Sequence, residues 1–86
     1  MNEAYILERL VSVFHEASFA LDFALDRDVA LEEIDGFDSV TRLRFMLSVE
    51  QAFTIEVSPR ENSKLKTVGD LVDLIQIKAN GGDVQK

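Results

Sequence analysis

The chain contains the stretch Gly36-Phe37-Asp38-Ser39-Val40, which places a serine where an apolar helix begins. The spacing of the residues that follow predicts this helix over 38–53, with Asp38 or Ser39 as its N-cap. A helix N-terminus offers unpaired backbone N–H groups and the positive end of the helix dipole, which would stabilise a phosphodiester on Ser39. The residue types leave two interpretations open: Ser39 caps the helix, or its hydroxyl is an attachment point.

The predicted helix over 39–53 is apolar around most of its circumference. At about 100° per residue, only Thr41, Arg44, Ser48 and Gln51 cluster as a polar strip. Such a helix is either nearly enclosed or shows hydrophobic surface to a partner.

Helical patterns recur on both sides of this segment. Residues 3–17 predict a first helix, capped by Asn2, with apolar residues at helical spacing. Ser58-Pro59 predicts a short third helix that ends near Ser63. Thr67-Val68-Gly69-Asp70 predicts the start of a last helix, in which Thr67 caps and Asp70 reaches back; Asn80-Gly81-Gly82 stops it.

The segment before Phe37 is long and acidic, but apolar residues are spaced through it. Because long loops are uncommon inside small domains, we expect five of them to hold this segment against the helices, with a short helical turn near residues 30–34. These five are Leu25, Val29, Leu31, Ile34 and Phe37. The predicted fold class is all-α: a small four-helix bundle of three main helices and one short third helix, with a long loop between helices one and two. We expect residues 1–80 to form this single domain and 81–86 to be a frayed tail.

Composition limits the function. The chain has 86 residues, 47% of them hydrophobic, and no cysteine, which excludes zinc fingers, disulfide scaffolds and thiol nucleophiles. The net charge of −7 argues against nucleic acid and favours basic partners. Residues 1–10 do not resemble a signal peptide, and no segment reaches the roughly 20 apolar residues of a transmembrane helix, so we expect a cytoplasmic protein. We also expect it to be a monomer.

Catalysis and metal binding are both disfavoured by the pattern. His15 lies within the first helix and Ser39 at the start of the second, and nothing indicates an oxyanion hole, so we do not predict a hydrolase. The acidic pairs, such as Glu32-Glu33, lack the glycine-centred pattern of a calcium loop, and we predict no metal site.

Taken together, these elements resemble an acyl carrier protein. The stretch Gly36-Phe37-Asp38-Ser39-Val40 is similar to the family's Gly-x-Asp-Ser-Leu motif, and Phe53 to the aromatic residue that closes its second helix. Thr67-Val68-Gly69-Asp70 matches a common opening of the family's fourth helix. The likeness spans nearly the whole chain.

The resemblance implies a carrier and not an enzyme. A phosphopantetheinyl transferase would esterify Ser39 with 4′-phosphopantetheine from coenzyme A, and acyl groups would be held on this arm as thioesters. The partners would be that transferase together with acyl-loading and acyl-transfer enzymes. The expected setting is a specialised fatty acid, lipid or polyketide pathway.

The resemblance also assigns roles to individual residues. Asp38 and Val40 would contact the transferase. The acyl chain would lie in the apolar interior beside helix two, lined by Leu43, Leu47, Phe53, Val57 and Leu65, although the same residues could be core alone.

One departure from the family concerns charge on helix two. Where relatives carry acids, this chain has Thr41, Arg42 and Arg44, and only Glu50 remains. Opposite charge steers association, so Arg42, Arg44 and Glu50 would help to select a dedicated set of partners; the alternative is that the arginines only face solvent.

Two other functions stay open. A peptidyl or aminoacyl carrier shares the bundle and the modified serine. An unmodified helical interaction module would use the apolar surface of helix two and leave Ser39 as a cap.

Overall fold

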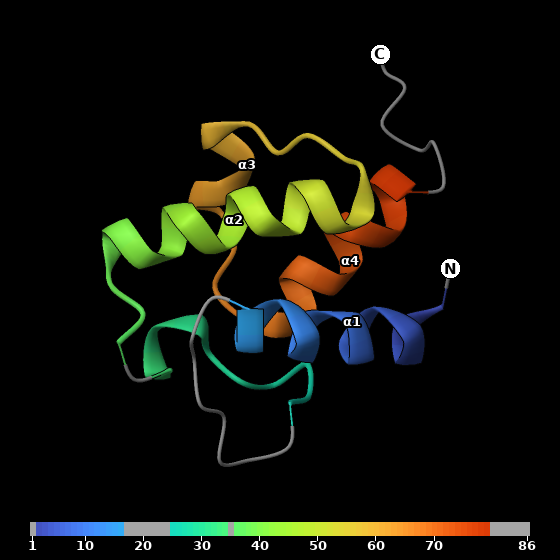
Figure 1. The fold of residues 1–86 in the computed structure, drawn as a ribbon, viewed down its shortest axis with the longest axis horizontal. Coiled ribbons are helices and arrows are strands. Elements are labelled where there is room, and N and C mark those ends of the chain that lie inside the picture. Colours follow the sequence, from blue (N-terminus) through green and yellow to red (C-terminus); the bar gives the residue numbers. More distant parts are fainter. Residues whose placement is uncertain (1, 17–24, 35, 80–86) are drawn as a thin grey trace.

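The computed structural model describes residues 2–16, 25–34 and 36–79. Within them lie α1 (Glu3–Glu16), the 3-10 turn η1 (Leu31–Glu33), α2 (Ser39–Phe53), α3 (Pro59–Ser63) and α4 (Val68–Ala79) (Figure 1). The described ranges contain no strand; Ala30 and Thr67 form an isolated antiparallel bridge. The prediction of an all-α fold with a short third helix is therefore confirmed. Ala17, the predicted stop at Asn80-Gly81-Gly82 and the predicted tail lie outside the described residues.

Helix α1 is central to the arrangement, because it packs against both α2 and α4. In Figure 1 α1 and α2 run in opposite directions, and the segment before α2 passes beneath α1 before it turns up into the α2 N-terminus. The short α3 lies above α2, on the side away from α1.

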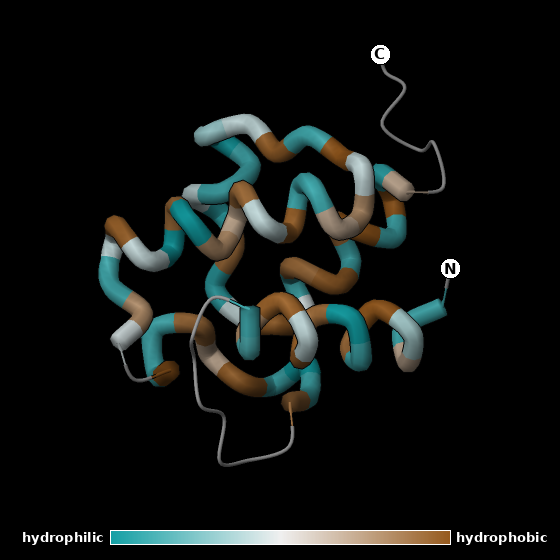
Figure 2. Tube along the Cα trace, viewed as in Figure 1, coloured by the Kyte–Doolittle hydropathy of each residue, from teal (hydrophilic) through white to brown (hydrophobic). Residues whose placement is uncertain are grey.

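The core forms where the apolar stripes of the three long helices meet, and hydrophobic residues recur along each of these helices in Figure 2. Burying these stripes is the main source of stability, at about 25 cal/mol per Å² of apolar surface. Ala79, the last residue of α4, is only half-buried. The buried residues of α1, α2 and α4 are Ile6, Leu10, Val13, Phe14, Phe45, Met46, Val49, Phe53, Val68, Gly69, Leu71, Val72 and Ile75.

Three phenylalanines fill the centre between α1, α2 and the segment before α2. The Phe14 and Phe45 rings stack with centroids 4.3 Å apart, and the Phe37 ring meets Phe45 edge-on at 5.5 Å. Because Phe37 lies directly before Asp38, this cluster fixes the point where the chain enters α2.

The segment over residues 25–37 is held against the bundle as the sequence predicts. Leu31 and Ile34 are buried, and Leu25, Val29 and Phe37 pack against the core. The predicted helical turn is η1.

Backbone hydrogen bonds tie this segment to the start of α4. The Leu31 N–H donates to Lys66 O at 2.9 Å, the Val68 N–H to Val29 O at 2.9 Å, and the Gly69 N–H to Arg27 O at 3.0 Å. Arg27 also forms ion pairs with Glu3 at 2.6 Å and Asp73 at 2.9 Å. The segment thus connects the first turn of α1 with α4.

Side-chain caps define where the other helices begin. Asn2 Oδ1 accepts from the Tyr5 N–H at 2.9 Å. Ser58 and Glu61 form a reciprocal capping box at α3, with Pro59 as the first helical residue. At α4 the Asp70 N–H donates to Thr67 Oγ1 at 3.1 Å, while Asp70 Oδ2 accepts from the Thr67 N–H at 3.2 Å. The caps predicted for these three helices are confirmed.

Candidate functional site

The N-terminus of α2 is capped by Asp38 and not by Ser39. Asp38 has extended backbone geometry, and its Oδ1 accepts from the Thr41 N–H at 2.9 Å. This hydrogen bond stabilises the ionised carboxylate and lowers the pKa of Asp38. The interpretation of Ser39 as the cap is wrong, because the aspartate one residue earlier satisfies the N–H group that a capping serine would have taken.

Ser39 is the first residue of α2 and is exposed to solvent. Gly36 adopts a positive φ of 81°, a conformation open to glycine, and this turn leads through Phe37 into the helix. Within the described part of the chain, no hydrogen bond involves the Ser39 hydroxyl. An exposed hydroxyl on the first turn of a long helix fits a phosphodiester, since the helix dipole favours an anion there.

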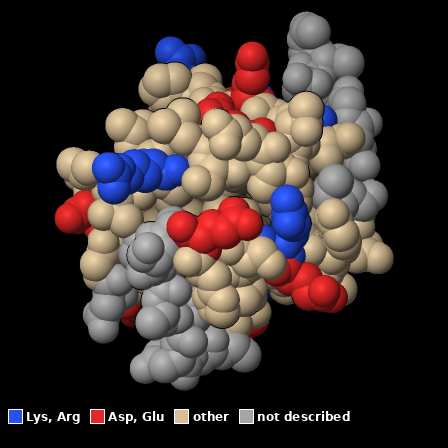
Figure 3. Space-filling view, in the orientation of Figure 1, with Lys and Arg blue, Asp and Glu red and all other residues tan. Residues whose placement is uncertain are grey.

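Three apolar side chains lie exposed along one side of α2. Val40 is 69% exposed, Leu43 59% and Leu47 52%. Their spacing places them within about 60° of one another around the helix axis. We call Val40, Leu43 and Leu47 the α2 stripe. In Figure 3 the surface over α2 carries few charged side chains.

The α2 stripe corrects the expectation that Leu43 and Leu47 lie in the interior. Helix α2 turns a different stripe toward α1 and the core, formed by Phe45, Met46, Val49 and Phe53. A helix has only one side to bury against a two-helix platform, so the remaining apolar residues face solvent. Of the other residues expected beside the acyl chain, Phe53 and Leu65 are buried in the core and Val57 is half-buried.

Arg42 is committed to contacts within the fold. Its guanidinium donates to Asn62 Oδ1 at 3.2 Å, to Asn62 O at 2.8 Å and to Leu65 O at 2.6 Å. The side chain is half-buried between α2 and the end of α3. Both sequence interpretations of Arg42, as a partner-selecting charge and as a solvent-facing residue, are corrected by these contacts. Arg44 does lie exposed.

Glu50 also has a role inside the fold. Its Oε2 accepts from the Val57 N–H at 2.7 Å, which holds the segment after α2 against the helix. Thr54 ends α2 in the left-handed region with φ 54°, and this reversal brings Val57 back toward Glu50. The expectation that Glu50 is a free charge for partners is therefore corrected.

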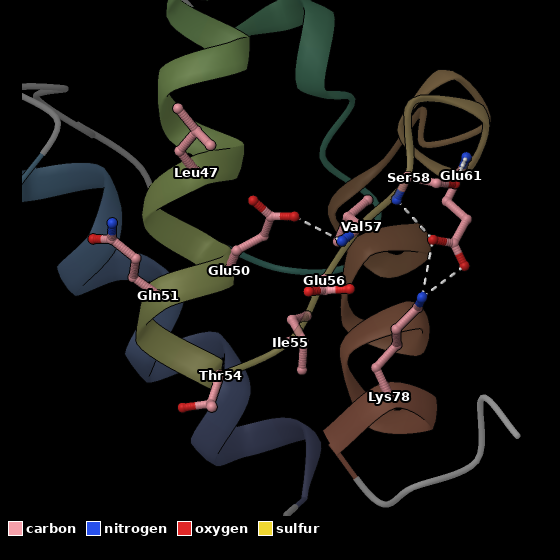
Figure 4. A pocket seen from close by; sticks show the side chains of 10 residues that line it. All are labelled: Leu47, Glu50, Gln51, Thr54, Ile55, Glu56, Val57, Ser58, Glu61 and Lys78. Carbon is pink, nitrogen blue, oxygen red and sulfur yellow. Dashed lines mark hydrogen bonds and ion pairs between the residues drawn. The ribbon is translucent and has the colours of Figure 1, made fainter.

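An open groove of about 1050 Å³ lies between the second half of α2, the segment after it, and α3 and α4 (Figure 4). In Figure 4 Lys78 reaches from α4 to Glu61, and the two form an ion pair of 2.9 Å. The residues that line the groove are Leu47, Glu50, Gln51, Thr54, Ile55, Glu56, Val57, Ser58, Glu61 and Lys78. The lining of the groove thus includes both apolar and charged side chains.

The described ranges contain neither a cluster of metal ligands nor a helix of membrane-spanning length. The side chains described there include no group of three or more histidines and acids that could hold a metal ion. No helix in those ranges has the length and apolar character needed to span a bilayer.

Comparison with known proteins identifies the family. Residues 7–75 match the family model described as a phosphopantetheine attachment site. The chain is 33% identical over 78 residues to acyl carrier protein 2 of Ralstonia nicotianae, an alignment that covers 88% of this chain and 94% of that protein. This chain belongs to the acyl carrier protein family. An acyl carrier protein of Thermosynechococcus vestitus is 27% identical over 91% of this chain and 96% of its own length.

A solved structure supports the same assignment. The solution structure of holo acyl carrier protein from Geobacter metallireducens superimposes with a TM-score of 0.74 at 26% identity, covering 98% of this chain and 92% of that one. The predicted family and fold are confirmed. Membership makes the protein a carrier and not a catalyst, with a covalently attached phosphopantetheine group that a phosphopantetheinyl transferase supplies and acyl-handling enzymes use.

Proposed function

We propose that Ser39 carries the 4′-phosphopantetheine arm and that the protein presents acyl intermediates as thioesters to the enzymes of a specialised fatty acid, lipid or polyketide pathway. The observation that supports this most directly is the division of roles at the α2 N-terminus. Asp38 caps the helix, which leaves the exposed Ser39 hydroxyl unused by the fold. We further propose that the carrier acts as a monomer in the cytoplasm.

The arm supplies a terminal thiol that this cysteine-free chain lacks, and a thiol with a pKa near 8.5 is readily acylated and readily released. The chain itself holds the attachment point in place. Phe37, packed against Phe14 and Phe45, and the Asp38 cap together fix the direction of the first turn of α2. A rigid attachment point lowers the entropy lost when the transferase binds.

Intact mass after incubation with coenzyme A, Mg²⁺ and a broad-specificity transferase tests the attachment. We expect the mass to rise by one phosphopantetheinyl group, and Ser39→Ala to prevent the rise. Ser48→Ala on the same helix is the matched control, since Ser48 lies on another side of α2 and should leave the modification unchanged. An unmodified wild-type chain would contradict the proposal and support the helical interaction module.

For recognition, we propose that acyl-handling enzymes dock on the α2 stripe and that an acidic group on them faces Arg44. The stripe begins one residue after Ser39, so a partner seated there also reaches the arm. Arg44 follows Val40 by one turn and lies on the same side of α2, and it is exposed on a protein whose net charge is −7. An exposed cation beside apolar surface favours a partner with complementary acidic charge there, while the acidic residues of the chain disfavour an acidic partner elsewhere.

The charge of Arg44 can be tested by reversal. We expect Arg44→Glu to raise the rate at which the host's general fatty acid synthase acyltransferase loads the modified protein, because family members in fatty acid synthesis usually carry acids on this helix. Arg9→Glu is the control, since Arg9 is an exposed arginine on α1, away from α2. Equal loading rates for the two variants would refute the role of Arg44.

The cargo decides between an acyl and a peptidyl carrier. Mass spectrometry of the protein purified from its own host reads the thioester directly. An aminoacyl or peptidyl group on Ser39 would overturn the acyl assignment while leaving the attachment site intact.

A further inference from the structure

Building on the proposed attachment at Ser39, we propose that Arg42 is a specificity-determining residue that keeps long saturated acyl chains from entering the core at the junction between the first turn of α2 and the end of α3. The protein would then carry acyl groups that are short, or that bear oxygen atoms which remain in water.

The position of Arg42 on its helix is unusual for an arginine. Residues 42, 45, 46, 49 and 53 recur at the spacing of a single buried stripe, and the last four are core residues. Arg42 therefore occupies the first turn of the core-facing side of α2. A charged side chain in such a place is retained only when its donors find partners.

The partners of Arg42 are all on the far side of the α2–α3 junction. Nη2 donates to the backbone oxygens of Asn62 and Leu65, and Nε donates to Asn62 Oδ1. Two of these acceptors belong to the last turn of α3 and the third follows it. We call this set of three hydrogen bonds the Arg42 bridge.

Apolar packing contributes little to holding α3. None of its residues is buried. At its first turn, Glu61 pairs with Lys78 of α4, whose side chain is 13% exposed. At its last turn the Arg42 bridge makes the connection to α2. Separating the end of α3 from α2 therefore requires breaking the three hydrogen bonds of the Arg42 bridge, all of which have a charged donor.

The Arg42 bridge lies between the attachment point and the interior. Arg42 follows Ser39 by three residues, so both lie on the first turn of α2. A saturated chain tethered at Ser39 can lower its free energy only by leaving water. Entering the core at the junction of Arg42 with the end of α3 would require displacement of the charged bridge, so the chain remains outside the core, over the α2 stripe or in the open groove.

Accessibility of the thioester provides the test. The modified protein is loaded with a butyryl or a dodecanoyl group, and hydroxylamine, which attacks thioester carbonyls that it can reach, releases the acyl group. In the wild type we expect both groups to be released at similar rates. In Arg42→Met, which keeps an apolar stem but cannot bridge, we expect dodecanoyl release to slow on the order of tenfold, comparable to the effect of one charge-assisted hydrogen bond. Butyryl release should not change.

Arg9→Met is the matched control, because it removes an exposed arginine of α1, away from α2, and should release both groups as the wild type does. Slow dodecanoyl release in the wild type, or equal behaviour of the two arginine variants, would overturn the proposal.

Hydrogen exchange on the unmodified protein gives a second readout that does not depend on Ser39. We expect Arg42→Met to accelerate exchange at the Asn62 and Leu65 amides, which donate to Ser58 O and Asn62 O, and to leave the Val72 and Ile75 amides of α4 protected. Unchanged exchange at α3 would refute the Arg42 bridge. Absence of phosphopantetheinylation would instead refute the attachment at Ser39.

Discussion

Replacing Phe45 with leucine tests whether the aromatic cluster stabilises the fold as its geometry indicates. Phe45 is fully buried, stacks on Phe14 at a centroid distance of 4.3 Å and meets Phe37 edge-on at 5.5 Å. Leucine keeps most of the apolar volume but loses both ring contacts, each worth about 0.5–1.5 kcal/mol beyond burial. We therefore expect Phe45→Leu to lower the free energy of unfolding by about 1–3 kcal/mol.

Urea unfolding followed by far-ultraviolet circular dichroism measures this loss. For a domain of this size, each kcal/mol corresponds to a fall in melting temperature of about 4–8 °C. Leu43→Ala on the same helix is the control: Leu43 is 59% exposed, so its removal should change the free energy by no more than about 0.5 kcal/mol. A loss below about 0.5 kcal/mol for Phe45→Leu, or an equal loss for Leu43→Ala, would refute the assignment of Phe45 to a tightly packed centre.

Two further predictions concern α4 and α3. Gly69→Ala should lower the free energy of unfolding, measured in urea, by about 1 kcal/mol, because a Cβ at position 69 would lie 2.9 Å from both Cβ and O of Arg27. Alanine is the better helix former, so a gain in stability would contradict this packing. Hydrogen bonds from the Ser58 N–H and from Lys78 lower the pKa of Glu61 in the folded protein. The ionised carboxylate therefore contributes to the free energy of unfolding above the unfolded pKa of about 4.3, and this contribution is lost as the pH falls through the folded pKa. When the pH is lowered from about 7 to about 3, the urea midpoint of Glu61→Gln should therefore fall less than that of the wild type. An equal fall in the two midpoints would contradict the link between Glu61 ionisation and stability.

Much of the fold could be predicted because it depends on local chemistry. Caps such as Asn2, Ser58 with Glu61, and Thr67 with Asp70 need only a few consecutive residues, and the structure contains each of them. The buried stripes of α1 and α4 follow a single helical period, which the sequence displays directly. The anchors of the loop before α2 could be predicted because its apolar residues have no other way to leave water.

The predictions for α2 were less accurate because this helix carries more apolar residues than it can bury. Its composition does not indicate which stripe faces α1 and the core, and for this reason the prediction that Leu43 and Leu47 lie in the interior is wrong. One signal could have corrected this: Arg42 shares a helical period with Phe45, Met46 and Val49, which predicts a buried arginine that needs acceptors. Those acceptors lie 20 and 23 residues later in the sequence and could not be inferred from spacing.

The contact of Glu50 was missed for a similar reason. Its partner is the Val57 N–H, which reaches Glu50 only because Thr54 adopts a left-handed conformation. Glycine and asparagine are the residues that usually predict this conformation, and threonine does not. Because the sequence does not show the internal partners of Arg42 and Glu50, it predicts a role in partner recognition for both. In the described structure, two of the three charged α2 residues proposed for that role are satisfied internally, and only Arg44 keeps it.

At the start of α2 the cap and the proposed attachment point are different residues, and this has a consequence for biosynthesis. Since the aspartate carboxylate and not the serine hydroxyl closes the first turn, esterifying that hydroxyl removes no hydrogen bond from the described fold. The newly translated polypeptide can therefore adopt its final shape before any prosthetic group arrives, and the transferase meets a finished substrate instead of completing its folding.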